Sequence, residues 1–229
     1  MQQRVIVILG MHRSGTSCLT GTLQEAGLYL GNVHRENPFN RKGNRENPEI
    51  MALHEDVLTH SGGSWLQPPP ACRWLPRHAT RRDTIIASYR AQKLWGFKDP
   101  RSLITIPFWR EALPELERVG IFRHPTAVAA SLRARDPALT FSSGLTLWRE
   151  YNRRLLEEYQ RAPFPVIEFV DNQQQLLESL CHIRQILSLP EPARATNFFD
   201  AGLQHQRGNS NVLDVQTRSL YEQLQALVV

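Results

Sequence analysis

Cysteine is scarce in this sequence. Only 3 cysteines occur among 229 residues, and Cys18, Cys72 and Cys181 lie too far apart to form the closely spaced pairs of zinc and redox sites. Three isolated cysteines do not indicate the disulfide framework of a small secreted protein either. We therefore expect buried or incidental thiols and no metal site.

Long apolar runs are also absent. The first apolar segment, Arg4 to Leu9, is shorter than the apolar core of a signal peptide, and no later segment approaches the length of a membrane-spanning helix. We expect a protein that has no transmembrane segment and is located in the cytoplasm.

No Pro/Gly/Ser-rich linker and no block of like charge divides the chain. Because 41% of its residues are hydrophobic, it can bury one sizeable core, and we expect a single domain over residues 1–229. The formal net charge of +5 comes largely from arginine and permits an anionic partner, such as a phosphate-bearing ligand or an acidic sugar. The composition does not predict an oligomeric state.

Short apolar segments alternate with amphipathic ones along the whole chain. This alternation predicts an α/β fold with three layers, in which a central, mostly parallel sheet is covered by helices on both faces. Ligands of such sheets collect at the carboxyl ends of the strands. The expected strands are 4–9, 94–97, 119–122 and 166–169, and the expected helices are 18–26, 49–60, 81–93, 102–113, 125 to about 135, 145–161, 172–187 and 214–227.

The first strand runs into a glycine-bounded loop, Gly10 to Ser17, that opens a helix. Backbone N–H groups of such a loop and of the first helical turn point toward one spot, where the helix dipole also favours an anion. The spacing of Gly10 and Gly15 is that of a P-loop, but Thr16 stands where a nucleoside triphosphatase carries lysine, which argues against ordinary ATP chemistry. Arg13 instead places a bidentate cation inside the loop. A glycine turn that merely joins strand to helix is the simpler alternative.

This loop resembles that of sulfotransferases that use 3'-phosphoadenosine 5'-phosphosulfate, in the bacterial branch with a Gly-x-x-Arg-Ser-Gly-Thr-Ser sequence. The resemblance covers most of the chain and implies a P-loop NTPase-like fold with adenosine 3',5'-bisphosphate as the product. It also implies that the loop holds the 5'-phosphosulfate group and that Arg13 acts in catalysis. The loop residues implied in binding are Gly10, His12, Arg13, Ser14, Gly15, Thr16 and Ser17.

A second matching motif follows the third expected strand. In the family, an arginine at a strand end and a serine eight positions later hold the ribose 3'-phosphate, and Arg123 and Ser131 fit this pattern. The two can converge only on a ligand that lies along the first turns of the helix. Taken alone, such residues are more often a surface arginine and a serine bonded to its own helix.

A third resemblance lies in Trp95 to Arg101, which is similar to the family's strand that delivers a Lys-Asp-Pro-Arg turn beside the acceptor. It implies that Lys98 stabilises charge on the sulfuryl group and that Arg101 holds an acidic acceptor. Since charged turn residues are common, a simple brace between Asp99 and Arg101 is an alternative.

A fourth resemblance places the general base. The segment from Asn40 to Ile50 is similar to the family's Asn-Pro-Lys-Gly-Tyr-Phe-Glu stretch, and Glu46 occupies the position of its glutamate. The departures are Arg41, Asn44 and Arg45, which bear on acceptor recognition, and loops at about 31–82 are expected to shape the acceptor pocket. Rivals for the role of base are Glu36, His34, Glu49, His54 and Asp99. A weaker match, Arg207-Gly208, implies a segment that closes over the cofactor.

Together these features predict in-line transfer of a sulfuryl group to a hydroxyl or amine of a small-molecule or glycan acceptor, without a metal. Two alternatives stay open. A small-molecule P-loop kinase needs magnesium and a strand-end aspartate, for which Asp99 is the candidate. A non-catalytic nucleotide-binding protein is the other, although no recognisable module indicates a specific nucleic-acid partner.

Overall fold

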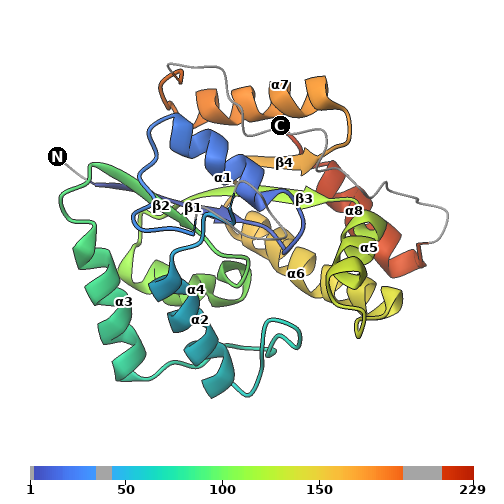
Figure 1. The fold of residues 1–229 in the computed structure, drawn as a ribbon, viewed down its shortest axis with the longest axis horizontal. Coiled ribbons are helices and arrows are strands. Elements are labelled where there is room, and N and C mark those ends of the chain that lie inside the picture. The colour runs from blue at the N-terminus through green and yellow to red at the C-terminus, as the bar shows by residue number, and fades with distance from the viewer. Residues whose placement is uncertain (1–2, 35–42, 193–212) are drawn as a thin grey trace.

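The computed structural model describes residues 3–34, 43–192 and 213–229. Its centre is a sheet of four parallel strands in the order β2-β1-β3-β4 (Figure 1). The strands are β1 (Arg4–Leu9), β2 (Leu94–Lys98), β3 (Glu117–Arg123) and β4 (Val166–Phe169). The first strand in the chain therefore lies in the interior of the sheet, between strands that come much later.

Helices cover both faces of this sheet, which makes the three layers plain in Figure 1. Helices α1 (Thr16–Glu25) and α7 (Gln173–Ile186) lie on one face, and α4 (Ser102–Ala112) and α6 (Phe141–Arg161) lie on the other. Helices α2 (Pro48–His60) and α3 (Pro76–Ser88) extend the second layer outward. Helices α5 (Pro125–Arg135) and α8 (Val215–Gln225) pack at its other end, beside α6.

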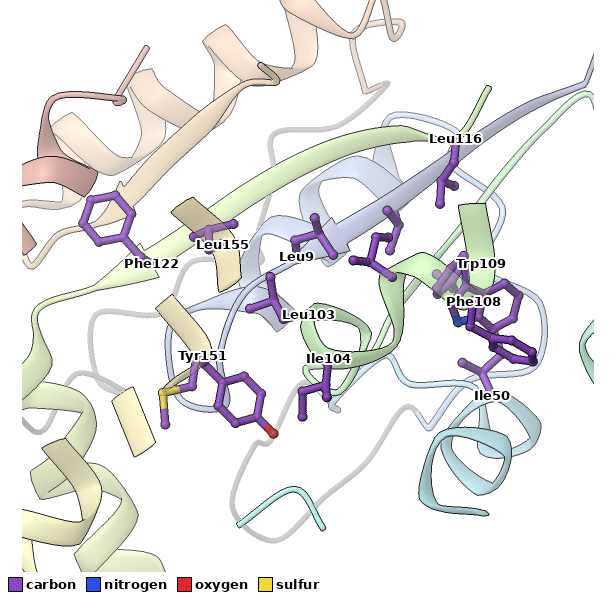
Figure 2. Packing of buried hydrophobic residues seen from close by; sticks show 14 of the residues in the cluster. Leu9, Ile50, Leu103, Ile104, Phe108, Trp109, Leu116, Phe122, Tyr151 and Leu155 are labelled. Atoms are coloured by element: carbon purple, nitrogen blue, oxygen red, sulfur yellow. The ribbon is translucent and has the colours of Figure 1, made fainter. Parts of the chain in front are cut away.

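Two hydrophobic cores follow from the alternation of side chains along β1. Val5, Val7 and Leu9 face the core shared with α2, α4 and α6, whereas Ile6 and Ile8 face the core shared with α1 and α7. In Figure 2, Leu9 lies close to Leu103 of α4, with Tyr151 and Leu155 of α6 nearby. Because both faces of the sheet are buried, the inner parts of β1, β2 and β3 are apolar, and the charged residues of these strands lie at their ends.

The strand register sets the position of the site. Ile8 of β1 lies opposite Lys98 of β2, and Leu9 lies opposite Gly120 of β3. The carboxyl ends of these strands therefore meet at one edge of the sheet, where Gly10 begins the first loop. This arrangement brings the turn after Lys98 to one side of the loop and the turn after Arg123 to the other.

The expected α/β fold with a parallel sheet and helices on both faces is confirmed, and all four strands lie where the sequence predicts them. The expected helix at residues 81–93 is wrong in its limits, since α3 spans Pro76–Ser88. Proline at the first helical position starts the helix, and the side chain of His78 accepts the Leu75 N–H at 3.1 Å. Helix α6 also begins earlier than expected, because Thr140 caps it by accepting the Ser143 N–H at 3.0 Å.

Among the described helices, none combines the length and apolar character needed to cross a membrane.

Candidate active site

The loop between β1 and α1 is shaped by two glycines that tolerate no side chain. A Cβ at Gly10 would lie 2.4 Å from the Ile121 carbonyl oxygen, and a Cβ at Gly15 would lie 2.1 Å from the Phe169 ring. Gly15 also has φ 86°, in the left-handed region that favours glycine. No side chain caps α1 at Gly15, and the Cys18 N–H already donates to the Gly15 carbonyl at 2.9 Å, so the N–H groups of Thr16 and Ser17 are the ones that face a ligand at this helix start.

Two polar side chains of this loop have buried atoms without a hydrogen-bond partner among the described residues. These atoms are Ser14 Oγ and His12 Nε2. Buried polar atoms are normally paired, so unpaired ones in a phosphate-type loop are suited to hydrogen-bond the oxygens of an anionic ligand. Burial first, and the charge of Arg101 second, lower the pKa of His12 to about 3, which keeps the imidazole neutral at physiological pH.

Arg13 joins the loop to the second predicted motif. Its Nε donates to Ser131 Oγ at 2.8 Å, although the two residues lie on different elements. Burial lowers the pKa of Arg13, and the nearby charges of Arg135 and Arg123 lower it further. Arginine nevertheless stays protonated in proteins. Three guanidinium groups and the α1 amino terminus thus create a strongly positive region, which fits an anion with more than one charged group.

Arg123 is fixed from several sides. Trp148 Nε1 donates to its carbonyl oxygen at 2.9 Å, and its guanidinium lies 5.1 Å from the centre of the Phe169 ring. Arg123 Nη2 donates to Asp171 Oδ1 at 3.4 Å. Burial lowers the pKa of Arg123, while the charge of Asp171 opposes this shift. Phe169 is the last residue of β4 and Asp171 lies two residues beyond it, and no motif in the sequence indicated that they support the site.

Lys98 and Glu46 form a buried ion pair. Lys98 Nζ donates to Glu46 Oε1 at 2.8 Å, and the side chains are only 2% and 8% exposed. The sequence indicated both residues for catalysis but not that they contact each other. Glu46 is held by its neighbour Asn47, whose Oδ1 caps α2 by accepting the Glu49 N–H and whose Nδ2 donates to the Tyr89 hydroxyl, both at 2.8 Å.

The turn after Lys98 is braced internally. Asp99 accepts hydrogen bonds from Arg101 N at 2.8 Å, Nε at 2.9 Å and Nη2 at 2.8 Å, and Arg101 Nη1 donates to Glu55 Oε1 at 2.7 Å. Burial would raise the pKa of Asp99, but the imidazole of His54, whose Nδ1 lies 3.5 Å from Asp99 Oδ2, and the guanidinium of Arg101 outweigh it and hold this pKa far below its ordinary value. The brace considered as an alternative for Asp99 and Arg101 is therefore present, and two carboxylates already occupy Arg101.

The rivals for the role of base lie in different surroundings. His34 neighbours Glu46 through the backbone, because His34 N–H donates to the Glu46 carbonyl at 3.1 Å. Glu49 lies in the first turn of α2, and His54 is buried against Trp109, whose Nε1 donates to His54 Nε2 at 2.7 Å. Glu36, Arg41 and Arg207 lie outside the described residues.

Sequence patterns missed an aromatic contact beside the loop. The rings of His12 and Trp65 lie 4.5 Å apart between centroids, and those of His12 and Tyr151 lie 6.0 Å apart. The Tyr151 hydroxyl donates to the Trp65 carbonyl at 3.0 Å, and Arg154 Nη2 donates to the Pro69 carbonyl at 2.9 Å. The Pro-rich segment that carries Trp65 is thus tied to α6 and reaches the loop. Its irregular sequence has no periodicity that would have revealed this contact.

Known proteins resemble the chain in structure rather than in sequence. No family model matches the chain, and no curated protein matches it in sequence. A solved structure of the sulfotransferase domain of the olefin synthase from Synechococcus PCC 7002 matches with a TM-score of 0.56 and 18% identity, over 97% of this chain and 95% of that chain. Sulfotransferase STF1 from Mycobacterium tuberculosis H37Rv matches with a TM-score of 0.48 and 16% identity, over 99% and 77%. Sulfotransferase STF9 from Mycobacterium avium matches with a TM-score of 0.47 and 14% identity, over 99% and 68%.

The match to the olefin synthase domain shows a shared fold. The chain has the same three-layer α/β fold with a parallel central sheet as that sulfotransferase domain.

Proposed function

We propose that the protein is a sulfotransferase that moves a sulfuryl group from 3'-phosphoadenosine 5'-phosphosulfate to a hydroxyl or amine of a small-molecule or glycan acceptor. The observation that carries this proposal is the hydrogen bond between Arg13 and Ser131, which unites the two predicted phosphate-binding motifs in one positive region. The sulfotransferase fold supports it. We further propose that the whole chain acts as one domain, with the segment at about 31–82 at the acceptor.

The geometry of the loop supports an assignment of the donor-binding residues. We assign the 5'-phosphosulfate to the N–H groups of Thr16 and Ser17 at the start of α1, to Ser14 Oγ and to the surrounding residues Gly10, His12 and Gly15. Arg123 and Ser131 are assigned to the 3'-phosphate, with Arg13 between the two sites.

Transfer follows from what these residues do. The acceptor oxygen or nitrogen forms a bond to sulfur as the bond from sulfur to the 5'-phosphate oxygen breaks, and the electron pair leaves with the phosphate. Arg13 and Lys98 stabilise the charge that develops, which is usually the largest contribution in such sites. Glu46 accepts the acceptor's proton on its carboxylate, a role worth typically about 10²–10⁴-fold in rate. These roles leave no step for a metal ion.

Calorimetry with adenosine 3',5'-bisphosphate and AMP, both without magnesium, tests the proposal. The bisphosphate should bind more tightly, because a charged contact of the kind that Arg123 and Ser131 offer the 3'-phosphate is worth about 1.5–3 kcal/mol. Equal affinity for the two nucleotides would contradict the assignment of the second motif. Magnesium-dependent binding of ATP in preference to the bisphosphate would favour a kinase.

A further inference from the structure

The ion pair between Lys98 and Glu46 joins the two residues to which the proposed reaction assigns opposite tasks. In the proposed function, Lys98 faces the sulfuryl group and Glu46 takes the acceptor's proton. In the structure, Lys98 Nζ donates to Glu46 Oε1 at 2.8 Å, so the two charged groups are paired with each other. Because both side chains are buried, water does not compete strongly for either charge. The carboxylate that must accept a proton is therefore held by the ammonium that must meet the donor.

The pair lies at the border of the phosphate-type loop. Lys98 is the last residue of β2 and lies opposite Ile8, two residues before Gly10. Its charge is one of the causes that lower the pKa of His12 inside the loop. The segment that carries Glu46 also contacts the loop, since Ser17 Oγ donates to the Asn44 carbonyl at 3.2 Å.

The two partners differ in how firmly they are held. Glu46 is fixed by the cap that follows it, by the hydrogen bond from Asn47 to Tyr89, and by backbone pairing with His34. Lys98 reaches Glu46 at the end of a flexible four-carbon chain, and its ammonium group can turn its three donors to a new acceptor without moving β2. When the pair opens, Lys98 is the partner that moves.

We propose that the sulfuryl group of the donor competes with Glu46 for Lys98, so that donor binding releases the Glu46 carboxylate for the acceptor's proton. This inference rests on the proposed function. Without donor, the ion pair keeps the base occupied, and a bisphosphate that has no sulfuryl group leaves the pair intact. Binding of the donor and readiness of the base are thus coupled through one side chain.

Equilibrium binding to four proteins tests this coupling without an acceptor. The proteins are the wild type, Glu46→Gln, Lys98→Met and the double variant, each titrated with the phosphosulfate donor and with adenosine 3',5'-bisphosphate. We expect Glu46→Gln to tighten donor binding about tenfold by freeing Lys98, and to leave bisphosphate binding unchanged. Lys98→Met should weaken donor binding alone. In the Lys98→Met background, Glu46→Gln should have no further effect.

The double variant is the matched control, because removal of a negative charge near any anion site favours anions in general. If Glu46→Gln tightens both ligands equally, or still tightens the donor when Lys98 is absent, the inference is wrong. Failure of the wild type to bind either nucleotide would instead contradict the proposed function.

Crystal structures of two wild-type complexes test the same proposal without any variant, and so do not depend on whether a variant folds. In the bisphosphate complex, Lys98 Nζ should stay bonded to Glu46. In the donor complex, it should contact the sulfuryl group instead. A lysine that stays on Glu46 in both complexes would overturn the proposal.

Discussion

Arg13 occupies a costly position in the loop. Its φ of 67° lies in the left-handed region, where a residue other than glycine is disfavoured by about 1–2 kcal/mol. Its guanidinium is partly buried beside the positive charges of Arg123 and Arg135. Such strain persists where the surroundings enforce it, and it is frequent at functional sites. Arg13 is therefore better explained by a ligand than by the stability of the free protein.

This explanation predicts that Arg13→Ala leaves the fold intact but abolishes transfer. Alanine has the same backbone strain and removes a like-charge repulsion, so the melting temperature of the free protein should not fall. Affinity for adenosine 3',5'-bisphosphate should fall about 10–100-fold, since charged hydrogen bonds are lost. Scanning fluorimetry and calorimetry measure the two quantities.

Arg13→Gly is the matched control. It should lose the same affinity but gain about 1 kcal/mol of stability, because glycine adopts the left-handed conformation freely. A lower stability of Arg13→Ala with unchanged nucleotide affinity would show that the residue is structural.

At the level of elements, the junction of β1 and α1 depends on β4. The Phe169 ring fills the space beside Gly15, so the loop's backbone and the end of β4 fit together without room for one methyl group. Gly62 offers a comparison within the same chain, because it has φ 75° but has nothing within 4 Å of an added Cβ.

Gly62→Ala should therefore cost only the backbone strain, about 1 kcal/mol, whereas Gly15→Ala should cost clearly more because its methyl group also collides with Phe169. Urea denaturation measures both free energies of unfolding. Phe169→Leu should recover part of the loss in the Gly15→Ala background. Equal losses at the two glycines would mean that the loop adapts by moving away from β4.

Sequence patterns predicted most elements because β1 to β4 are apolar runs bounded by turns. The limits of α3 were missed because two of its inward positions are polar. His78 and Arg82 are both buried in this helix, with Arg82 donating from Nη1 to the Phe108 carbonyl at 2.6 Å. An apolar periodicity cannot reveal a face whose buried residues are satisfied by hydrogen bonds.

The candidate site was predictable only where one segment contains the chemistry. Gly10 to Ser17 is such a segment, and its glycines and Arg13 are recognisable in order. The bond from Lys98 to Glu46 and the contact of Trp65 with His12 join segments far apart in sequence. Their existence depends on the register of β2 and on where the Pro-rich segment crosses α6, neither of which a single sequence specifies.

For the whole molecule, His12 predicts how stability changes with pH. Its pKa in the folded protein is about 3, below the ordinary value of about 6.5, so the unfolded chain binds a proton that the folded chain does not. Stability from this residue is complete above pH of about 6.5 and is lost as pH falls toward 3, by up to about 1.4 kcal/mol per pH unit.

Chemical denaturation of the wild type and of His12→Gln between about pH 7 and pH 4 tests this prediction. The wild type should lose stability more steeply than the variant as the pH falls. Parallel curves for the two proteins would mean that His12 titrates in the folded protein as it does in the unfolded chain.

The interior position of β1 has a consequence for how the protein is made. Synthesis proceeds from the amino terminus, yet both hydrogen-bonding edges of β1 wait for β2 and β3, which end at Lys98 and Arg123. At a typical rate of about 5–20 residues per second, this wait lasts on the order of ten seconds on the ribosome. Throughout that interval an apolar strand and the loop that follows it are exposed on the nascent chain. The loop that follows β1 is thus synthesised before both strands that flank β1 in the sheet, and it acquires its structure only after they have been made.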